Sequence, residues 1–364
     1  MKHRELSRRD FVKTGVGAAL GATVVPFSLG TACRTAADRG SIVAIAKVNN
    51  GKIGYAVEEA IDLLGGIEMA TKGKERIMLK PNLVAEGRDF TTKPEVIEAL
   101  ARLMKQSGKD VLIGEGSAAA EGFNVLDGEP YRTSDCEILD GMQQHVFDQL
   151  GYTELAKSLR VPLVNLHTGE MADIPITNGL AYDNITLHQS LTEIDLLCSV
   201  PMMKTHVLAT VTLGLKNLIG LYPGSSYCSV RACVHDQASL AGSPGIAFEI
   251  LDMARANKMG LCVVDGSTAM EGDGPTSGEL VDMGLIIAGT DPLATDMVTA
   301  HLMGIEAAEV PTFAWAHKSG MTPASLDEIE IRGAPLDDVR RPFKKPNVVP
   351  WTSINTVWGV KELS

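Results

Sequence analysis

The stretch SVPMMKTHVLATVTLGLKNLIG, residues 199–220, begins with the pattern of a buried strand and ends with that of an apolar helix. A continuous apolar run is typical of a strand covered on both faces in a parallel sheet. The stretch also contains Lys204, His206 and Lys216, and none of its residues is acidic. Because burying an unpaired cation is strongly unfavourable, we expect these side chains to emerge into a polar cleft. The alternative is that the lysines extend along apolar neighbours to the surface.

Strand and helix patterns alternate on both sides of this stretch. Apolar runs predict strands over residues 41–48, 75–82, 110–117, 161–167, 193–206, 260–267 and 283–290, and an edge strand over 326–333. Amphipathic patterns predict helices over residues 55–70, 93–108, 145–159, 246–257 and 291–304. This alternation predicts an α/β fold with a mostly parallel sheet that carries helices on both faces.

The chain is predicted to have three parts. Residues 1–40 are expected to be a signal peptide and linker, residues 41–334 the α/β domain, and residues 335–364, which are rich in proline, an irregular tail. The 364 residues are 45% hydrophobic and 21% charged, which is ordinary for a globular protein. The net charge of −12 argues against a nucleic-acid partner.

One short segment of the domain occurs twice in similar form. EGSAAAEG at 115–122 and DGSTAMEG at 265–272 share five residues when they are aligned without a gap, and each follows an apolar strand. Unless this is a chance match between small-residue loops, it predicts two related lobes, about 41–190 and 191–334, around one cleft.

The N-terminus matches an export signal. SRRDFVK, residues 7–13, fits the twin-arginine signature, and an uncharged stretch rich in glycine and alanine follows it. We expect the twin-arginine translocase as a partner, a periplasmic or extracytoplasmic location, and no permanent transmembrane anchor. Lipid attachment at Cys33 is the less favoured alternative, since Gly30 stands where leucine is usual.

The cysteines bear on redox chemistry in an oxidising compartment. Cys228 and Cys233 are close enough in sequence to form a local disulfide, or both stay free. The chain has no array of closely spaced cysteines, so we expect no iron–sulfur cluster of its own. A divalent metal or another cofactor is compatible with export of a folded protein, and its identity stays open.

Polar residues stand where several predicted strands end. They are Lys80 and Asn82 in LKPN, Glu115 in GEGS, Lys204 and His206 in MKTH, and Asp265 in VVDGS. In open α/β sheets ligands bind outside the carboxyl ends of the strands. Each residue alone could simply mark where its strand reaches the surface, but their recurrence predicts a shared cleft.

The end of the opening stretch suits an anion. Lys204 and His206 are two residues apart and project from one face of a strand. A helix is predicted to start near Thr210, which would aim free N–H groups, together with Lys216 and Asn217, at the same cleft. Such a set suits a carboxylate or phosphate.

Acidic residues farther along are candidate metal ligands. Asp265, Glu271 and Asp273 lie on a predicted glycine-rich loop and offer oxygen atoms to Mg²⁺ or Ca²⁺, although their spacing is not that of an EF-hand. His235 could ligate a metal or carry protons, or be a plain loop histidine. Asp291 precedes a proline, which predicts a helix N-cap rather than a catalytic residue.

Four segments together resemble a known family. LKPNLV (79–84), PMMKTHVLATVTLGLKNLIGLYPG (201–224), VVDGSTAMEGDGPTSGEL (263–280) and AGTDPLATDMVTAHLMG (288–304) resemble, in order and spacing, motifs of the prokaryotic family called domain of unknown function 362. The resemblance covers about residues 42–310.

The resemblance implies a fold and a set of site positions, but no reaction. The family's recurrent polar positions fall on Lys80, Asn82, Lys204, His206, Lys216, Asn217, His235, Asp265, Glu271, Asp291 and Asp296. Many members carry a ferredoxin-like cysteine module that this chain lacks, so the label of iron–sulfur protein is not carried over.

The leading hypothesis is an enzyme that acts on a small anionic substrate in the cleft between the lobes. Lys204 and Lys216 would bind the anion, His206 would be the acid and base, and Asp265 and Glu271 would orient that base or hold a divalent metal. The remaining ligand-binding candidates are Lys80, Asn82, Glu115, Asn217 and His235. The alternatives are a non-catalytic protein that binds an anion or metal, and an accessory redox protein that works with a separate iron–sulfur partner.

Overall fold

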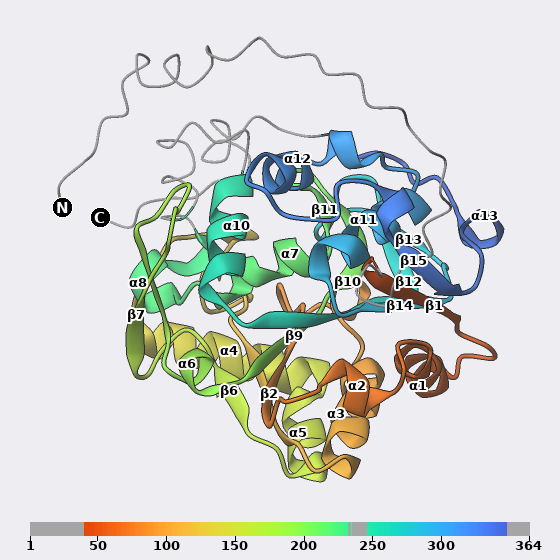
Figure 1. Ribbon diagram of the computed structural model, residues 1–364. Helices are drawn as coiled ribbons and strands as arrows, with labels where there is room; N and C mark the ends of the chain where they lie inside the picture. The colour runs from red at the N-terminus through yellow and green to blue at the C-terminus, as the bar shows by residue number, and fades with distance from the viewer. Residues whose placement is uncertain (1–39, 232–233, 235–245, 348–364) are drawn as a thin grey trace, which may run out of the picture. The chain divides into compact units, whose positions relative to one another are not determined.

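The apolar runs of the sequence form the strands of a mixed sheet. The computed structural model describes residues 40–231, 234 and 246–347 (Figure 1). Its strands are β1 (Ile42–Lys47), β2 (Arg76–Pro81), β3 (Asp110–Glu115), β4 (Val125–Leu126), β5 (Glu129–Pro130), β6 (Leu163–Asn165), β7 (Met171–Pro175), β8 (Asn184–His188), β9 (Leu196–Val200), β10 (Met202–His206), β11 (Thr210–Thr212), β12 (Met259–Glu271), β13 (Glu279–Val281), β14 (Leu285–Gly289) and β15 (Glu330–Gly333).

Helices alternate with these strands. The α-helices are α1 (Ile53–Leu63), α2 (Ile67–Ala70), α3 (Pro94–Gln106), α4 (Cys136–Leu150), α5 (Tyr152–Leu159), α6 (Ser190–Glu193), α7 (Gly214–Asn217), α8 (Gly224–Tyr227), α10 (Ala247–Ala256), α11 (Pro292–Leu302), α12 (Pro311–Lys318) and α13 (Leu336–Val339). Short 3-10 helices cover Arg88–Phe90, Leu218–Leu221, Ser229–Arg231, Ala307–Glu309 and Leu326–Glu328.

Within the described residues, eleven strands form one sheet with the order β15-β1-β14-β12-β9-β2-β3-β6. The neighbours from β12 to β6 are all parallel, and β14 is antiparallel to both β12 and β1. Outside this order, β10 and β13 pair with the C-terminal half of β12, and β11 pairs with β10. The prediction of a mostly parallel α/β sheet is confirmed, as is the edge strand, which is β15.

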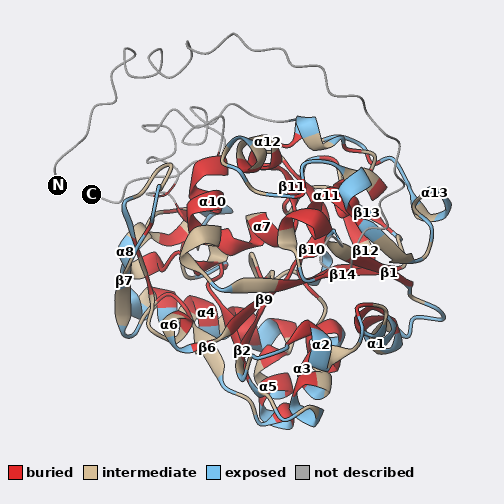
Figure 2. Cartoon of the chain, in the orientation of Figure 1, coloured by how far each residue is buried: buried red, intermediate tan, exposed pale blue. Residues whose placement is uncertain are grey.

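Apolar side chains fill both faces of the sheet. Val43 and Ile45 of β1 belong to a core with α7, α10, α11 and α12, whereas Ala44 and Ala46 belong to a second core with α1, α3, α4 and α5. The two groups of helices lie on opposite sides of the sheet, and their inner surfaces are buried (Figures 1 and 2). Successive side chains of a strand thus enter opposite cores. Because both cores are apolar, each strand appears in the sequence as a continuous apolar run.

Several predicted elements are interrupted. The helix expected over 55–70 breaks at Gly65 and Gly66, whose φ angles are 101° and 88°, and the one expected over 145–159 divides at Gly151, with φ of 82°. These left-handed conformations favour glycine and end a helix. The strand expected over 193–206 divides at Pro201 into β9 and β10.

Three further expectations differ from the structure. DGSTAMEG at 265–272 is not a loop, because β12 continues through Glu271 and pairs with β10 and β13. No helix starts near Thr210, because residues 210–212 form β11, antiparallel to β10, and α7 begins at Gly214. The tail expected to be irregular contains one turn of helix, α13.

The chain divides into two units, Met1–Arg39 and Gly40–Ser364. The predicted lobes both contribute strands to the eleven-stranded sheet, and the described residues also form two separate two-stranded sheets, β4-β5 and β7-β8. The predicted signal sequence, Cys33, Cys233 and His235 lie outside the described residues. Among the helices of the described part, none is long and apolar enough to cross a membrane.

Candidate active site

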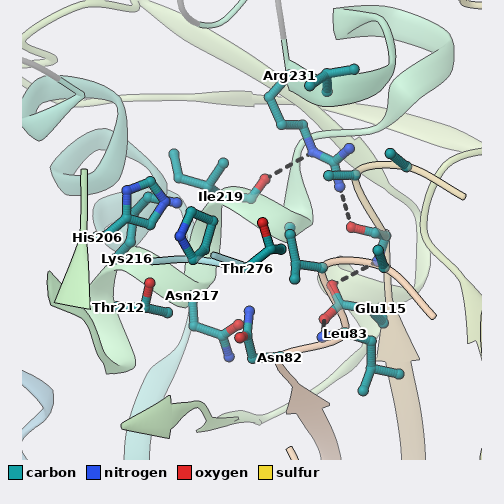
Figure 3. Close-up of a pocket in the computed structure, with 18 of the residues that line it drawn as sticks. Asn82, Leu83, Glu115, His206, Thr212, Lys216, Asn217, Ile219, Arg231 and Thr276 are labelled. Carbon is teal, nitrogen blue, oxygen red and sulfur yellow. Dashed lines mark hydrogen bonds between the residues drawn. The ribbon is translucent and has the colours of Figure 1, made fainter. Parts of the chain in front are cut away.

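A pocket of about 160 Å³ opens at the carboxyl ends of β2 and β3, beside β10, β11 and α7 (Figure 3). Polar and charged residues that line it are Lys80, Asn82, Glu115, Arg132, Lys204, His206, Thr212, Lys216, Asn217, Arg231 and Thr276. Seven of the residues predicted from the sequence are among them: Lys80, Asn82, Glu115, Lys204, His206, Lys216 and Asn217. The structure thus brings these predicted residues to one place, as the strand-end argument requires.

A buried ion pair forms the floor of the pocket. Lys80 Nζ lies 2.7 Å from Glu115 Oε1, and the two side chains are 1% and 2% exposed. Lys80 also donates to Asn217 Oδ1 at 3.0 Å and to the Pro81 carbonyl at 2.9 Å, so its three N–H groups are all used. Burial lowers the pKa of Lys80, and the Glu115 carboxylate partly offsets this.

Glu115 is held from three sides. Its Oε1 accepts from the Gly116 N–H at 2.8 Å as well as from Lys80, and its Oε2 accepts from the Leu83 N–H at 2.9 Å. The carboxylate is therefore already satisfied by the protein. Gly220 makes this packing feasible, since a Cβ there would lie 2.4 Å from Glu115 Oε1.

Two side chains fix the short helix α7 over this floor. Asn217 Nδ2 donates to the Lys80 carbonyl at 3.1 Å and to Ser199 Oγ at 3.0 Å. Asp296 of α11 accepts from the Gly214 and Leu215 N–H groups at 2.7 and 2.8 Å, which caps the start of the helix. The position of Lys216 on α7 is thereby set by contacts with two strands and another helix.

Lys204 points into the pocket from β10 but is not paired with an acid. Its Nζ donates to the Phe90 carbonyl at 2.6 Å and to the Pro275 carbonyl at 3.1 Å, which leaves one N–H of the ammonium. Burial lowers the pKa of Lys204 well below its usual range, and the positive charge of Lys216 lowers it further.

Lys216 differs from the other two lysines. No hydrogen bond or ion pair of its ammonium is found within the described part of the chain, and its side chain is partly exposed to the pocket. Burial lowers the pKa of Lys216 to about 7, and the nearby charges of Lys80 and Arg231 act in the same direction. Near neutral pH this group therefore exists both as amine and as ammonium.

His206 enters the pocket from the end of β10. Its Nδ1 accepts from the Leu208 N–H at 3.0 Å, so the neutral ring carries its proton on Nε2. In Figure 3 His206 and Lys216 reach into the pocket from one side and Glu115 from the other. An imidazole ring and a lysine with a pKa of about 7 thus face the same space.

Arg231 completes the pocket and was missed by the sequence analysis. Its guanidinium donates to the Ile219 and Ser117 carbonyls, both at 3.1 Å, and to the Gly116 carbonyl. Those three bonds leave two of its five N–H donors. Burial lowers the pKa of Arg231 to about 10, well above neutrality, so the side chain remains charged at pH 7.

The backbone that presents Arg231 is strained. Cys228, Val230 and Arg231 each have a φ of 58°, although none is glycine. Left-handed conformations of such residues typically cost roughly 1–3 kcal/mol each and cluster at functional sites. No hydropathy or spacing signal marks this segment, because the strain exists only in the folded backbone.

Two buried polar atoms of the pocket lack partners among the described residues. They are Asn82 Oδ1 and Thr212 Oγ1. Buried polar groups are nearly always paired in native proteins. Unpaired groups beside charged donors with spare N–H groups are the pattern expected where a ligand or water completes the site.

The acidic residues farther along do not belong to the pocket. Asp265 is fully buried in β12, where it accepts from the Lys93 N–H at 2.9 Å and from Ser267 Oγ at 2.6 Å. Glu271 accepts from the Lys344 N–H, and Asp273 binds the Asn347 backbone and side chain. Each makes hydrogen bonds with its own neighbours and none lines the pocket, so these contacts do not support the expectation that Asp265 and Glu271 orient His206.

The same three residues do not form a metal centre. Within the described ranges, no group of three or more His, Cys, Asp or Glu side chains is placed to hold a metal ion. The N-cap predicted for Asp291 is confirmed, because its Oδ1 accepts from the Ala294 N–H at 3.0 Å at the start of α11. His235 is not among the described residues, and its predicted role stays a prediction.

Comparison with known proteins places the chain in context. Residues 77–301 match a family described as domain of unknown function, DUF362. The chain is 27% identical over 304 residues to a thylakoid-associated protein of Synechocystis sp., covering 82% of this chain and 85% of that protein.

Similarity to solved structures is weaker. The lactate racemase apoprotein of Thermoanaerobacterium thermosaccharolyticum aligns with a TM-score of 0.42 and 12% identity, over 76% of this chain and 59% of the racemase chain. A Thermotoga maritima protein aligns with a TM-score of 0.34 and 15% identity, over 59% of this chain and 50% of its own. Likenesses of this size do not bear on the chemistry of the pocket.

Proposed function

Because the chain belongs to the domain of unknown function 362 family, whose description names no reaction, we propose from the pocket itself that it binds and transforms a small carboxylate or phosphate. One observation carries this proposal. Among the described residues, the pocket gathers five Lys or Arg side chains (Lys80, Arg132, Lys204, Lys216 and Arg231), and the one carboxylate among them, Glu115, is already bound to Lys80. In a chain of net charge −12, such a local excess of positive charge favours an anionic guest.

The size of the pocket limits the guest. A cavity of about 150 Å³ in another protein holds a molecule of about six non-hydrogen atoms, and this one measures about 160 Å³. Inorganic phosphate and short carboxylates such as acetate and lactate are of that size. Spare donors of Lys204 and Arg231 are the groups that would hold the anion.

Proton transfer would then fall to His206 and Lys216. Burial lowers the pKa of Lys216 to about 7, and the imidazole of His206 is a side chain that commonly serves as acid and base. A general acid or base works best when its pKa is close to the working pH. Lys204, whose nitrogen is fixed by two carbonyl groups, would offer its remaining N–H to the anion as a hydrogen-bond donor.

A thermal-shift experiment tests this function. Acetate, lactate and phosphate would be titrated at constant ionic strength, because salt alone screens a charged pocket. We expect at least one to raise the melting temperature of the wild-type chain, since a ligand at 100 times its Kd adds about 2.7 kcal/mol to native-state stability. The Lys216→Met variant should respond less, and Lys157→Met, which removes a lysine that is 67% exposed on α5, should respond normally.

Two outcomes of this experiment count against the proposal. If none of the three anions stabilises the wild type, or if both variants respond like the wild type, the pocket is not an anion site. An anion that stabilises the protein but is recovered unchanged would favour a non-catalytic binding protein instead.

We also propose that the protein is exported by the twin-arginine translocase to the periplasm or another extracytoplasmic compartment. The motif at 7–13 supports this proposal. Replacement of Arg8 and Arg9 by lysine should retain the chain in the cytoplasmic fraction, which cell fractionation would show. An equal distribution of wild type and variant would contradict it, and a membrane-bound mature chain would favour lipid attachment at Cys33.

A further inference from the structure

We infer that Lys216 is a nucleophile that forms an imine with the carbonyl carbon of a small 2-oxo acid; this inference rests on the proposed anion site. The carboxylate of such a substrate is the anion that the pocket attracts, and the adjacent carbonyl group is what an amine attacks. The substrate class is thus the 2-oxo acids, and imine formation is a covalent step that anion binding alone does not require.

The contacts of the three pocket lysines single out Lys216. Lys80 is surrounded by a carboxylate, an amide oxygen and a carbonyl, and Lys204 by two carbonyls. Such acceptors stabilise an ammonium group and occupy its N–H bonds. Within the described residues Lys216 has no acceptor at all, so its nitrogen lone pair can become available.

The charges around Lys216 act in the same direction. Lys80 and Arg231 are the positive groups that lower its pKa after burial itself, and Lys204 interacts with it as well. A lysine desolvated beside other cations is the usual environment of an amine that attacks carbonyl compounds. The cations around it are held in place by their own hydrogen bonds, so they stay fixed as the reaction proceeds.

The remaining donors can orient the substrate. Arg231 keeps two N–H groups, Lys204 keeps one, and Thr212 Oγ1 has no partner. A carboxylate held by these groups would place its neighbouring carbonyl close to the Lys216 side of the pocket. Pyruvate has six non-hydrogen atoms by its formula, and the pocket of about 160 Å³ is large enough to hold a molecule of that size.

The step balances without an oxidant or reductant. The lone pair of Lys216 Nζ forms the new C–N bond, and the carbonyl π electrons move to oxygen. The two amine protons then join that oxygen, with His206 as the group that carries them, and the C–O bond breaks to release water. The product is a neutral imine, which His206 can protonate.

Reductive trapping tests the inference directly. The full-length chain would be mixed with pyruvate and sodium borohydride, which transfers hydride to an imine carbon, and then analysed by intact mass and peptide mapping. We expect one reduced adduct, located on Lys216. Its yield in a short pulse should rise about tenfold between pH 6 and pH 8, because the amine fraction of a group with a pKa of about 7 rises by that factor.

Variants separate the covalent step from anion binding. Lys216→Arg keeps the positive charge but cannot form an imine, so it should give no adduct. Lys157→Met should give the wild-type adduct. If the wild type gives no adduct, or if Lys216→Arg retains it, the inference is wrong even when acetate stabilises the protein. A wild type that responds to none of acetate, lactate and phosphate would instead remove the proposed function.

Discussion

The buried pair of Lys80 and Glu115 offers the sharpest test of how the pocket is built. We consider Glu115→Gln, which changes one oxygen to an NH₂ group and keeps the shape. Either orientation of the new amide places a donor against a donor. On the Oε1 side it meets the Lys80 ammonium and the Gly116 N–H, and on the Oε2 side it meets the Leu83 N–H.

The cost follows from these contacts. Leaving one buried donor unsatisfied costs about 1–3 kcal/mol, and breaking a buried ion pair by removing one partner costs about 3–5 kcal/mol. The two effects overlap, because Lys80 can lose its proton when the carboxylate is gone. We therefore expect a loss of about 3–5 kcal/mol in the free energy of unfolding at pH 7, or roughly 5–15 °C in the melting temperature.

Thermal and urea unfolding, followed by circular dichroism, would measure this loss. Glu154→Gln is the matched control, because Glu154 and Lys157 are also 2.7 Å apart but 79% and 67% exposed. We expect no measurable change there. A double-mutant cycle with Lys80→Met should give a coupling of at least about 2 kcal/mol. A Glu115→Gln variant as stable as Glu154→Gln, or additive effects in the cycle, would refute the reasoning.

Two further predictions concern packing and pH. Gly220→Ala should lower the melting temperature and abolish the response to anions, because the new Cβ would lie 2.4 Å from Glu115 Oε1. Gly54→Ala is the control and should be tolerated, because its Cβ would lie 3.9 Å from the nearest atom. Equal melting temperatures and equal anion responses of the two variants would contradict this prediction. Glu249 of α10 is fully buried, neither carboxylate oxygen has a partner, and burial raises its pKa from 4.5 to about 8. The native state thus retains a proton that the unfolded chain releases, and this group's contribution to stability falls as pH rises from about 4.5 to 8. Glu249→Gln should therefore gain melting temperature relative to wild type between pH 5 and pH 9, and a constant difference would exclude this account.

The strand ends were predictable because they depend on local pattern. Lys80 and Glu115 each close an apolar run, and parallel strands place their carboxyl ends at one edge of the sheet. Asp265 closes a similar run, yet β12 continues for six more residues beyond it. The reason is tertiary, since Lys93 and Ser267 satisfy its carboxylate inside the fold and β10 supplies a partner for the longer strand.

Other features of the site depend on the folded chain alone. Arg231 reaches the pocket through a left-handed backbone conformation. The residue types of SVRACV, residues 229–234, do not predict that conformation. The prediction of a helix from Thr210 failed because an apolar run of this length suits either a strand or a helix. Pairing of β11 with β10 decided between the two.

Three lysines in one pocket meet the cost of burial in three different ways. Lys80 is buried beside a carboxylate, and Lys204 is buried against two carbonyl oxygens. Lys216 has no acceptor among the described residues, and burial lowers its pKa to about 7; burial also lowers the pKa of Lys204 well below its usual range, but its nitrogen stays bound to the two carbonyl groups. A purely structural cluster would have no reason to keep the third arrangement, because methionine at that position would fill the same space without a pKa near 7. Of the two lysines in residues 199–220, Lys204 donates to two carbonyl oxygens, whereas the nitrogen of Lys216 has no acceptor among the described residues, which is the state that the proposed attack on a carbonyl carbon requires.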